Sequence, residues 1–246
     1  MPHRSHRLLI TDMVTAILLA AGSGNRMQGQ VQDKILTPLH GKPAFIYSLQ
    51  AFVDSSLVDE YIVVYRDEAQ KAQLSALVQD HGLQELKISG APGGQERQDS
   101  VIHALNTVNE RCEFVFIHDC ARPCITASAI QSLHQAVVSD KAACLAHPVV
   151  DTIKRIPQAN QTQQVELEDL DRNRLWAMET PQAFHFQSIL KAYQNVIKQK
   201  RAITDDTAAA ASIGLHTTLV SNTSPNPKLT TPADIAYIEF LLKHSR

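Results

Sequence analysis

Several features that define common classes of protein are missing from this sequence of 246 residues. It has no apolar run close to the roughly 20 residues that a membrane-spanning helix requires, so we expect no membrane association of that kind. The formal net charge is only −2, which argues against a general nucleic-acid-binding protein and leaves room for a local basic pocket. The hydrophobic fraction of 44% is enough for a sizeable core, so disorder is not expected.

The cysteines also lack the spacing of a metal site or a redox motif. None of the four belongs to a Cys-x-x-Cys pair, and no histidine stands at the spacing that zinc sites use. We therefore expect free and mostly buried thiols in a reducing cytosol, at Cys112, Cys120, Cys124 and Cys144.

Residues 1–12 do not resemble a secretion signal. They contain two histidines and two arginines before an apolar stretch of three residues, which is too short for the core of a signal peptide. We expect a flexible extension there, with the start at either Met1 or Met13, followed by one domain of residues 13–246. Cytoplasmic residence is the expectation that follows.

The two best-known nucleotide fingerprints are absent, although a glycine-containing turn lies in the expected place. Residues 14–21 form an apolar run typical of a strand buried on both faces, and two glycines follow it, Gly22 and Gly24. Met27 stands where a dinucleotide motif needs its third glycine, and no Gly-Lys-Ser/Thr ending of a P-loop is present. Small residues, backbone N–H groups and two nearby cations still suit a polyphosphate, the cations being Arg26 and Lys34. An ordinary strand-to-helix turn is the alternative.

The rest of the chain alternates between apolar strand patterns and amphipathic helix patterns. Such alternation predicts an α/β fold with a parallel sheet and right-handed crossovers. In such sheets the ligand lies beyond the carboxyl ends of the strands, which is where the glycine turn lies. We expect strands at 14–21, 61–65, 86–89, 114–117, 142–149 and 216–221, and helices at 43–54, 68–81, 98–108, 126–138, 188–199, 207–213 and 232–243.

The end of the strand at 86–89 carries a second pair of glycines. Gly93 and Gly94 allow the backbone to approach a ligand closely, and the first turn of the helix predicted after them presents N–H groups and Ser100. A capped helix start with no ligand is the alternative. Arg97 and the paired glycines favour a ligand.

The end of the strand at 114–117 carries an acid. Asp119 stands where a Mg²⁺ ligand is expected in a fold with a phosphate loop, and a helix or turn cap is its alternative. The adjacent His118 is interpreted as a packed or hydrogen-bonded histidine rather than a catalytic base.

The periodicity changes after residue 150. Alternating residues and a polar segment indicate a hairpin-like arm at 151–179 that interrupts the α/β core, with short strands at 165–170 and 175–178. An exposed apolar edge of this kind is commonly covered by a partner subunit, so a homodimer formed through the arm is expected.

Eight segments in register resemble the 2-C-methyl-D-erythritol 4-phosphate cytidylyltransferase family. The resemblance extends from about residue 14 to residue 240. The segments are Leu-Ala-Ala-Gly-Ser-Gly-Asn-Arg-Met, the following Lys34, Gly-Gly-Gln-Glu-Arg-Gln-Asp-Ser, His-Asp-Cys-Ala-Arg-Pro, Asp-Thr-Ile-Lys, Asp-Arg-Asn-Arg-Leu-Trp, Thr-Pro-Gln and Asn-Pro-Lys-Leu-Thr.

The resemblance implies a reaction, a fold and a set of site residues. The expected reaction transfers a cytidylyl group from CTP to the phosphate of methylerythritol phosphate and releases pyrophosphate, with Mg²⁺. The expected fold is a Rossmann-like, mostly parallel sheet with helices on both faces and a protruding β-arm used for dimerisation. The family positions correspond to Arg26, Lys34, Arg172 and Lys228 for catalysis, Ala20, Ala21, Gly22, Gly24, Gly93, Gly94 and Ser100 for CTP, Arg122, Thr152 and Thr204 for the second substrate, and Asp119 for the metal.

The sequence departs from the family pattern at three points. Asp33-Lys34-Ile35 stands where the family usually has Pro-Lys-Gln, in a slightly longer loop; Gln95 replaces an aspartate, and Cys120 replaces an alanine.

Two other functions are alternatives to this one. A ribitol 5-phosphate cytidylyltransferase would share the CTP half of the site, although the context of Leu175-Trp176 and Thr180-Pro181-Gln182 favours methylerythritol phosphate. A non-catalytic nucleotide-binding regulator would be expected to lack Arg26, Lys34 or Lys228, and the sequence has all three.

Overall fold

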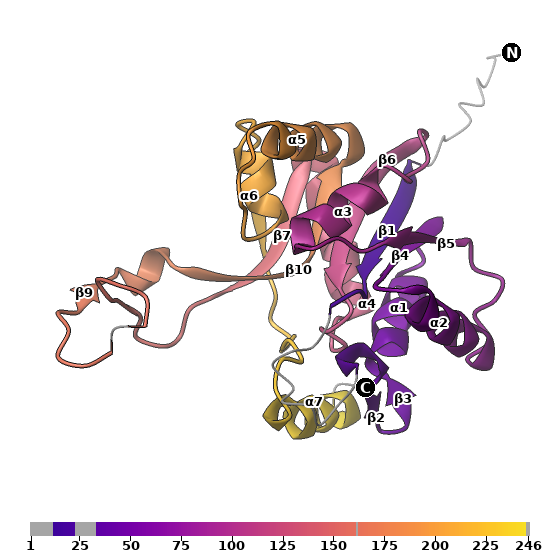
Figure 1. The fold of residues 1–246 in the computed structure, drawn as a ribbon, viewed down its shortest axis with the longest axis horizontal. Helices are drawn as coiled ribbons and strands as arrows, with labels where there is room; N and C mark the ends of the chain where they lie inside the picture. The colour runs from indigo at the N-terminus through magenta and orange to yellow at the C-terminus, as the bar shows by residue number, and fades with distance from the viewer. Residues whose placement is uncertain (1–11, 23–32, 161, 245–246) are drawn as a thin grey trace, which may run out of the picture.

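A seven-stranded sheet forms the centre of the molecule. The computed structural model describes residues 12–22, 33–160 and 162–244. Within them the strand order is β11-β7-β10-β6-β1-β4-β5, and β10 alone runs antiparallel to its neighbours (Figure 1). The strands are β1 (Met13–Leu19), β4 (Glu60–Tyr65), β5 (Ile88–Pro92), β6 (Cys112–Asp119), β7 (Ala142–Pro148), β10 (Trp176–His185) and β11 (Thr218–Ser221).

Helices cover both faces of this sheet, as expected for a Rossmann-like fold. Two separate hydrophobic cores lie on the two faces. The first includes side chains of α1 (Ala44–Ser55), α2 (Glu68–Asp80), α4 (Ala127–Asp140) and α7 (Ala233–His244). The second includes side chains of α3 (Arg97–Leu105), α5 (Phe186–Lys198) and α6 (Asp206–Ala211). Among the described residues, no helix is both long and apolar enough to span a membrane.

Strand β1 is buried from both sides, as its continuous apolar sequence predicts. Ala16 and Leu18 belong to the first core, and Ile17 between them belongs to the second. Successive side chains of a strand point to opposite faces, so one uninterrupted apolar run serves both cores. The strand pairs in parallel with β4 on one side and with β6 on the other.

The connections reverse direction at β1. The chain proceeds outward from β1 to β4 and β5, and then returns to place β6 on the opposite side of β1. A ligand crevice is expected at such a switch point, outside the carboxyl ends of the strands. The loops after β1, β4, β5 and β6 therefore meet at one edge of the sheet.

Most predicted elements occur with ends shifted by a few residues, and β5 is an example in the central sheet. The strand predicted at 86–89 begins at Ile88 and ends at Pro92, where each residue pairs with Tyr61–Tyr65 of β4. The sequence Ser89-Gly90-Ala91-Pro92 has no strand-forming residue at any of its four positions, so tertiary pairing rather than propensity sets this strand.

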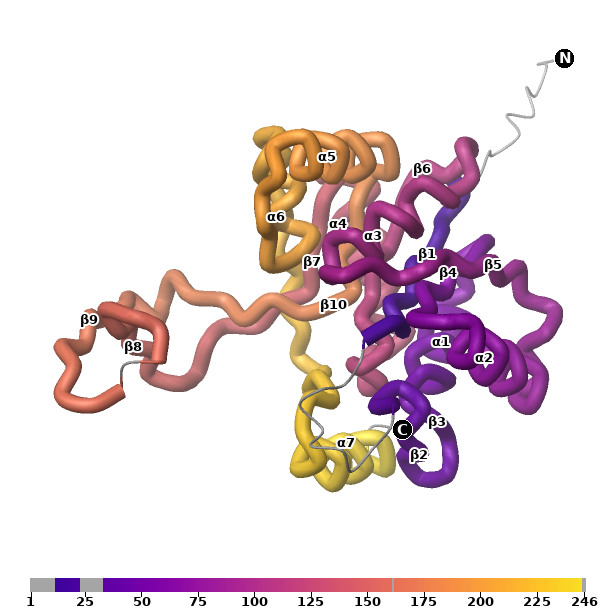
Figure 2. The backbone as a smooth tube through the Cα atoms, in the orientation of Figure 1, coloured from indigo at the N-terminus to yellow at the C-terminus, as the bar shows by residue number. Residues whose placement is uncertain are grey.

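The arm extends away from the body of the molecule (Figure 2). It contains a two-residue ladder between β8 (Lys154–Arg155) and β9 (Glu168–Asp169), and a 3-10 helix, η3 (Arg172–Arg174). The strands predicted at 165–170 and 175–178 need correction. The first shrinks to β9, and the second is the start of β10, which runs on to His185 within the central sheet. Pairing of Trp176, Ala177 and Met178 with the end of β7 makes the arm's returning chain continuous with the sheet.

Candidate functional site

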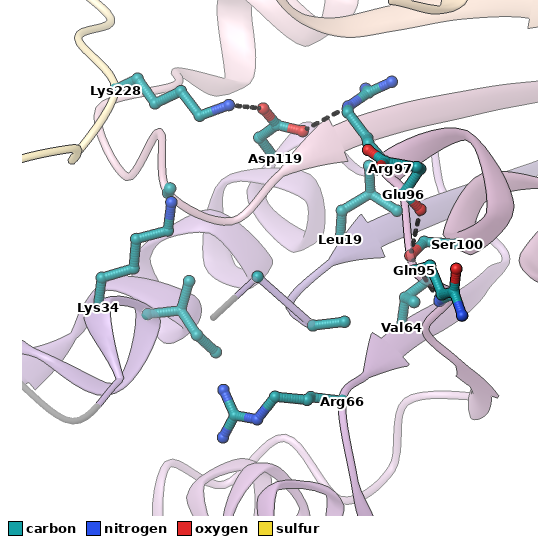
Figure 3. Close-up of a pocket in the computed structure, with 15 residues that line it drawn as sticks. Leu19, Lys34, Val64, Arg66, Gln95, Glu96, Arg97, Ser100, Asp119 and Lys228 are labelled. Atoms are coloured by element: carbon teal, nitrogen blue, oxygen red, sulfur yellow. Dashed lines mark hydrogen bonds and ion pairs between the residues drawn. The ribbon is translucent and has the colours of Figure 1, made fainter. Parts of the chain in front are cut away.

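A pocket of about 370 Å³ lies at the carboxyl edge of the sheet, beside the switch point. Its walls come from the loops after β1, β4, β5 and β6, from the 3-10 helix η2 (Lys34–Leu36) and from Lys228. Lys34 and Lys228 enter it from one side, and Gln95 and Ser100 lie on the other (Figure 3). It therefore collects residues from six segments of the chain.

The segment after β1 forms the pocket's floor. Ala20 is buried and donates its N–H to the carbonyl of Val64 at 2.9 Å, while Ala21 and Gly22 line the pocket. A Cβ built on Gly22 would lie 3.8 Å from Cε of Lys34, which is ordinary contact. The predicted site residues Gly24 and Arg26 lie outside the described residues.

The paired glycines allow a close approach that no other residue would permit. A Cβ on Gly93 would lie 2.7 Å from Cβ of Ala21, and one on Gly94 would lie 2.2 Å from Cβ of Asp99. Gly94 lines the pocket and donates its N–H to Oγ of Ser100 at 3.0 Å, and that hydroxyl donates to the carbonyl of Glu96. Ser100 therefore braces the loop that carries Gly94.

The start of α3 differs from the predicted position by one residue. Glu96 is the N-cap, and Asp99 returns a hydrogen bond to its N–H at 3.0 Å, so the two form a capping box. The capped helix start, which was the alternative to a ligand site here, is thus present. It coexists with the pocket because Gly94 and Ser100 face the cavity from the same turn.

Asp119 lies at the end of β6 between two cations. Its Oδ2 accepts from Nζ of Lys228 at 2.5 Å, and its Oδ1 accepts from Nε of Arg97 at 3.2 Å (Figure 3). Burial alone would raise the pKa of Asp119, but Arg97 and Lys228 outweigh it and hold that pKa below its usual value. The carboxylate is therefore ionised at neutral pH and keeps both cations at the pocket.

Arg97 is held from behind by a buried acid. Both carboxylate oxygens of Asp206, which is fully buried, accept from the guanidinium at 2.8 and 2.7 Å, and the hydroxyl of Tyr193 donates to Asp206 at 2.5 Å. Burial alone would lower the pKa of Arg97, but Asp206 and Asp119 raise it well above its ordinary value. Arg97 is therefore a fixed positive charge of the pocket. In the sequence, its position after the paired glycines was the only indication of this role.

Lys228 is positioned by a loop that a buried glutamate secures. Oε2 of Glu179 accepts from the side-chain amides of Asn222 and Asn226 at 2.8 and 2.9 Å, and Oε1 contacts Nδ1 of His147 at 2.6 Å. Glu179 is only 2% exposed. This residue was missed in the sequence because nothing in its neighbourhood suggests that two later asparagines fold against it.

The residues predicted to bind the second substrate are not gathered at this pocket within one chain. Arg122 donates to the backbone carbonyls of Asn226 at 2.6 Å and Met178 at 3.4 Å. Thr204 is exposed in the loop before α6. Thr152 and Arg172 are exposed on the arm, where Arg172 donates to the carbonyl of Val150 at 2.8 Å. A single chain thus supplies the pocket but not the arm residues predicted to join it.

His118 and the cysteines agree with the interpretation made from the sequence. His118 is fully buried beside Oγ1 of Thr180, 3.2 Å from Nδ1, and burial lowers its pKa to about 3. It is a packed histidine that stays neutral. All four cysteines are free thiols, and Cys124 is the half-buried one.

Asp119 is the residue of the pocket that could bind a magnesium ion. No cluster of three or more His, Cys, Asp or Glu side chains suited to a metal occurs within residues 12–22, 33–160 and 162–244. Magnesium is commonly held by one or two carboxylates together with substrate phosphates and water, so a single aspartate suffices. Each oxygen of Asp119 has one cation partner and retains a further lone-pair direction. Asp119 would therefore be able to hold a magnesium ion whose other ligands come from a substrate and from water.

Comparison with known proteins identifies one family throughout. Residues 14–244 match the family model described as 2-C-methyl-D-erythritol 4-phosphate cytidylyltransferase. A protein of that name from Caldanaerobacter subterraneus subsp. tengcongensis is 35% identical over 231 residues, covering 94% of this chain and 99% of the relative. Another from Symbiobacterium thermophilum is 36% identical, covering 94% of this chain and 93% of the relative.

Solved structures agree with the sequence comparison. The 2-C-methyl-D-erythritol 4-phosphate cytidylyltransferase of Francisella tularensis superposes with a TM-score of 0.75 at 28% identity, covering 94% of this chain and all of that one. The 4-diphosphocytidyl-2C-methyl-D-erythritol synthase of Anaerococcus prevotii reaches a TM-score of 0.81 at 22% identity, covering 95% of this chain and all of that one. The second likeness is one of fold.

Proposed function

Because the chain belongs to the 2-C-methyl-D-erythritol 4-phosphate cytidylyltransferase family, and so transfers a cytidylyl group from CTP to that polyol phosphate in isoprenoid precursor biosynthesis, we propose that the pocket beside β1 is its CTP site. One observation supports this above the others. Lys34, Lys228 and Arg97 converge on one cavity at the switch point of the sheet, around a single ionised aspartate.

The proposed chemistry needs fixed positive charge rather than a covalent nucleophile. A phosphate oxygen of the polyol phosphate attacks the α-phosphorus of CTP in line, the bond to the bridging oxygen breaks, and pyrophosphate leaves with the electron pair. Negative charge grows on the phosphorus and on the leaving group. Lys34 and Lys228 are proposed to stabilise that charge, together with Arg26, which lies outside the described residues.

Asp119 is proposed to be the metal ligand and to orient Lys228. Its carboxylate is held open toward the pocket by Arg97, which cannot turn away because both ends of its guanidinium are bonded to Asp206. When bound, Mg²⁺ would neutralise charge on the triphosphate. Lys228, already directed by Asp119, would add positive charge at the same cavity.

The nucleoside is proposed to rest on the two glycine-containing segments. Ala21 and Gly22 would face the triphosphate and ribose, with buried Ala20 behind them, and Gly93, Gly94 and Ser100 would face the cytosine and ribose. Gly24, also proposed for CTP, lies outside the described residues. Gly94 is open to the pocket, and the tight contact between Gly93 and Ala21 sets the spacing of the two segments. Side chains larger than hydrogen would separate them.

The second substrate is proposed to bind between the pocket and a partner's arm. Arg172 and Thr152 are exposed on the arm, while Arg122 and Thr204 belong to the body. An arm from a second copy of the chain would bring Arg172 to the attacking phosphate, whose dianion suits the forked donors of arginine. We accordingly propose a homodimer, one nucleotidyltransferase domain of residues 13–246 with the arm at 151–179, and cytoplasmic residence.

The activity is tested by measuring pyrophosphate release from CTP and Mg²⁺ with two polyol phosphates side by side. We expect rapid release with 2-C-methyl-D-erythritol 4-phosphate and little with ribitol 5-phosphate. The reverse preference would support ribitol 5-phosphate as the substrate. CTP binding without release from either would indicate the non-catalytic regulator and contradict the proposed activity.

A further inference from the structure

We propose that Asp33 is a positioning residue for Lys34, acting with the buried amide of Gln70. The inference rests on the proposed role of Lys34 in the CTP site. It concerns the residue directly before Lys34 in the chain. The contacts of the described residues carry it.

Asp33 uses its two carboxylate oxygens for different purposes. It is only 5% exposed. Oδ1 accepts from the N–H of Ile35 at 3.2 Å and so caps the short helix that begins with Lys34. Oδ2 accepts from Nε2 of Gln70 at 2.6 Å and from NH1 of Arg66 at 3.2 Å. One oxygen shapes the local turn, and the other attaches it to the body of the protein.

Gln70 connects this carboxylate to the floor of the pocket. Gln70 is 1% exposed. Besides Asp33, its Nε2 donates to the carbonyl oxygen of Ala20, with 3.1 Å between the two atoms. Its Oε1 accepts from the backbone N–H of Arg66 at 2.6 Å. Every hydrogen-bonding group of the amide is therefore used, and the reversed amide would set oxygen against two acceptors. Gln70 links the loop after β1, the loop after β4 and the helix of Lys34.

The consequence is that three walls of the pocket are fixed relative to one another. Ala21, Arg66 and Lys34 all line the cavity. Arg66 binds Asp33 directly, and the other two directly follow Ala20 and Asp33, which are bound in this cluster. Lys34 and Arg66 lie on adjoining sides of the pocket (Figure 3). The reaction rate falls steeply when a catalytic group is misplaced by even a small distance. The contacts that hold this turn should therefore affect the rate more than their contribution to stability suggests.

The conformation of Asp33 shows that the turn does not copy a proline turn. Its φ is −145°, far from the value near −65° that a proline ring imposes. The rigidity that a proline would provide through its ring comes here from a carboxylate and a buried amide. Substituting proline at this position would therefore break the cap and both tertiary contacts.

The test is a double-mutant cycle with Asp33→Asn and Lys34→Ala in the full-length protein, measuring kcat, KM for CTP and KM for the polyol phosphate. Asparagine caps helices as well as aspartate, but its amide group removes the negative charge and the acceptor that Gln70 and Arg66 share. The matched control is Asp59→Asn, because the Asp59 carboxylate also accepts from a distant backbone N–H, that of Val14 at 2.8 Å, but lies outside the pocket and outside this cluster.

We expect Asp33→Asn to lower kcat about tenfold or more, Lys34→Ala to lower it about 10²–10³-fold, and the double variant to equal Lys34→Ala within about twofold. Asp59→Asn should behave like the unmodified protein. Additive losses, or an unaffected Asp33→Asn beside an impaired Lys34→Ala, would overturn this inference alone. An unaffected Lys34→Ala would overturn the proposed role of Lys34 as well. If Asp33→Asn does not fold, Gln70→Met removes the same connection from the other side and enters the same cycle with the same expectation.

Discussion

The contact between Lys228 and Asp119 is the most informative at the scale of single residues. The two are 109 positions apart in the sequence, and their side chains meet at 2.5 Å. Each was predicted as a site residue from its own motif, but the contact between them was not predicted. Pairing depends on how the loop of residues 222–228 crosses the end of β6, and no local pattern encodes that path.

Lys228→Ala should depress kcat by about 10²–10³-fold without unfolding the protein. The fold should survive because Asp119 keeps its bond to Arg97 and is not left as an unpaired buried charge. Steady-state kinetics and a thermal unfolding curve measured on the same preparation check both statements. An unchanged kcat would remove Lys228 from the catalytic site.

At the scale of elements, the loop that carries Lys228 is attached to β10 through Glu179. Only the start of this strand was predicted, at 175–178, because the polar run Glu179-Thr180-Pro181-Gln182 breaks the apolar alternation, and the register shifts at the same place. By contrast, β1 and β6 were predictable, because their apolar runs are typical of strands buried on both faces. Gly22 of the predicted glycine turn lines the pocket. The side chains that brace the pocket from behind, Gln70, Asp206 and Glu179, were not predicted. Their partners come from other elements.

Glu179→Ala should destabilise the protein by about 2–4 kcal/mol, because the amides of Asn222 and Asn226 lose the buried acceptor they share. It should also lower kcat, since the loop of Lys228 loses its attachment to β10. Denaturant unfolding measures the first effect and steady-state assays the second. Glu113→Ala, at a half-exposed position of β6, is the control and should change neither by much. Equal stability of the two variants would contradict the anchoring role.

At the scale of the whole molecule, the exposed arm is the feature that a single chain does not explain. Val150, Ile153 and Leu167 are large apolar residues with 79%, 40% and 53% of their surface exposed. Arg172 and Thr152 lie on the same arm, away from the pocket of their own chain. A closed two-fold dimer would bury the apolar residues and give each pocket the partner's Arg172.

The most direct test of this two-chain site is complementation between two inactive variants. Lys228→Ala and Arg172→Ala are co-expressed with different affinity tags, and heterodimers are purified through both tags. One pocket of each heterodimer then combines an intact Lys228 with an intact Arg172, so we predict about half the wild-type turnover per dimer. If the arm served its own chain, both pockets would be incomplete and the heterodimer would remain as inactive as its parents. That result, or the failure of heterodimers to form, would contradict the account.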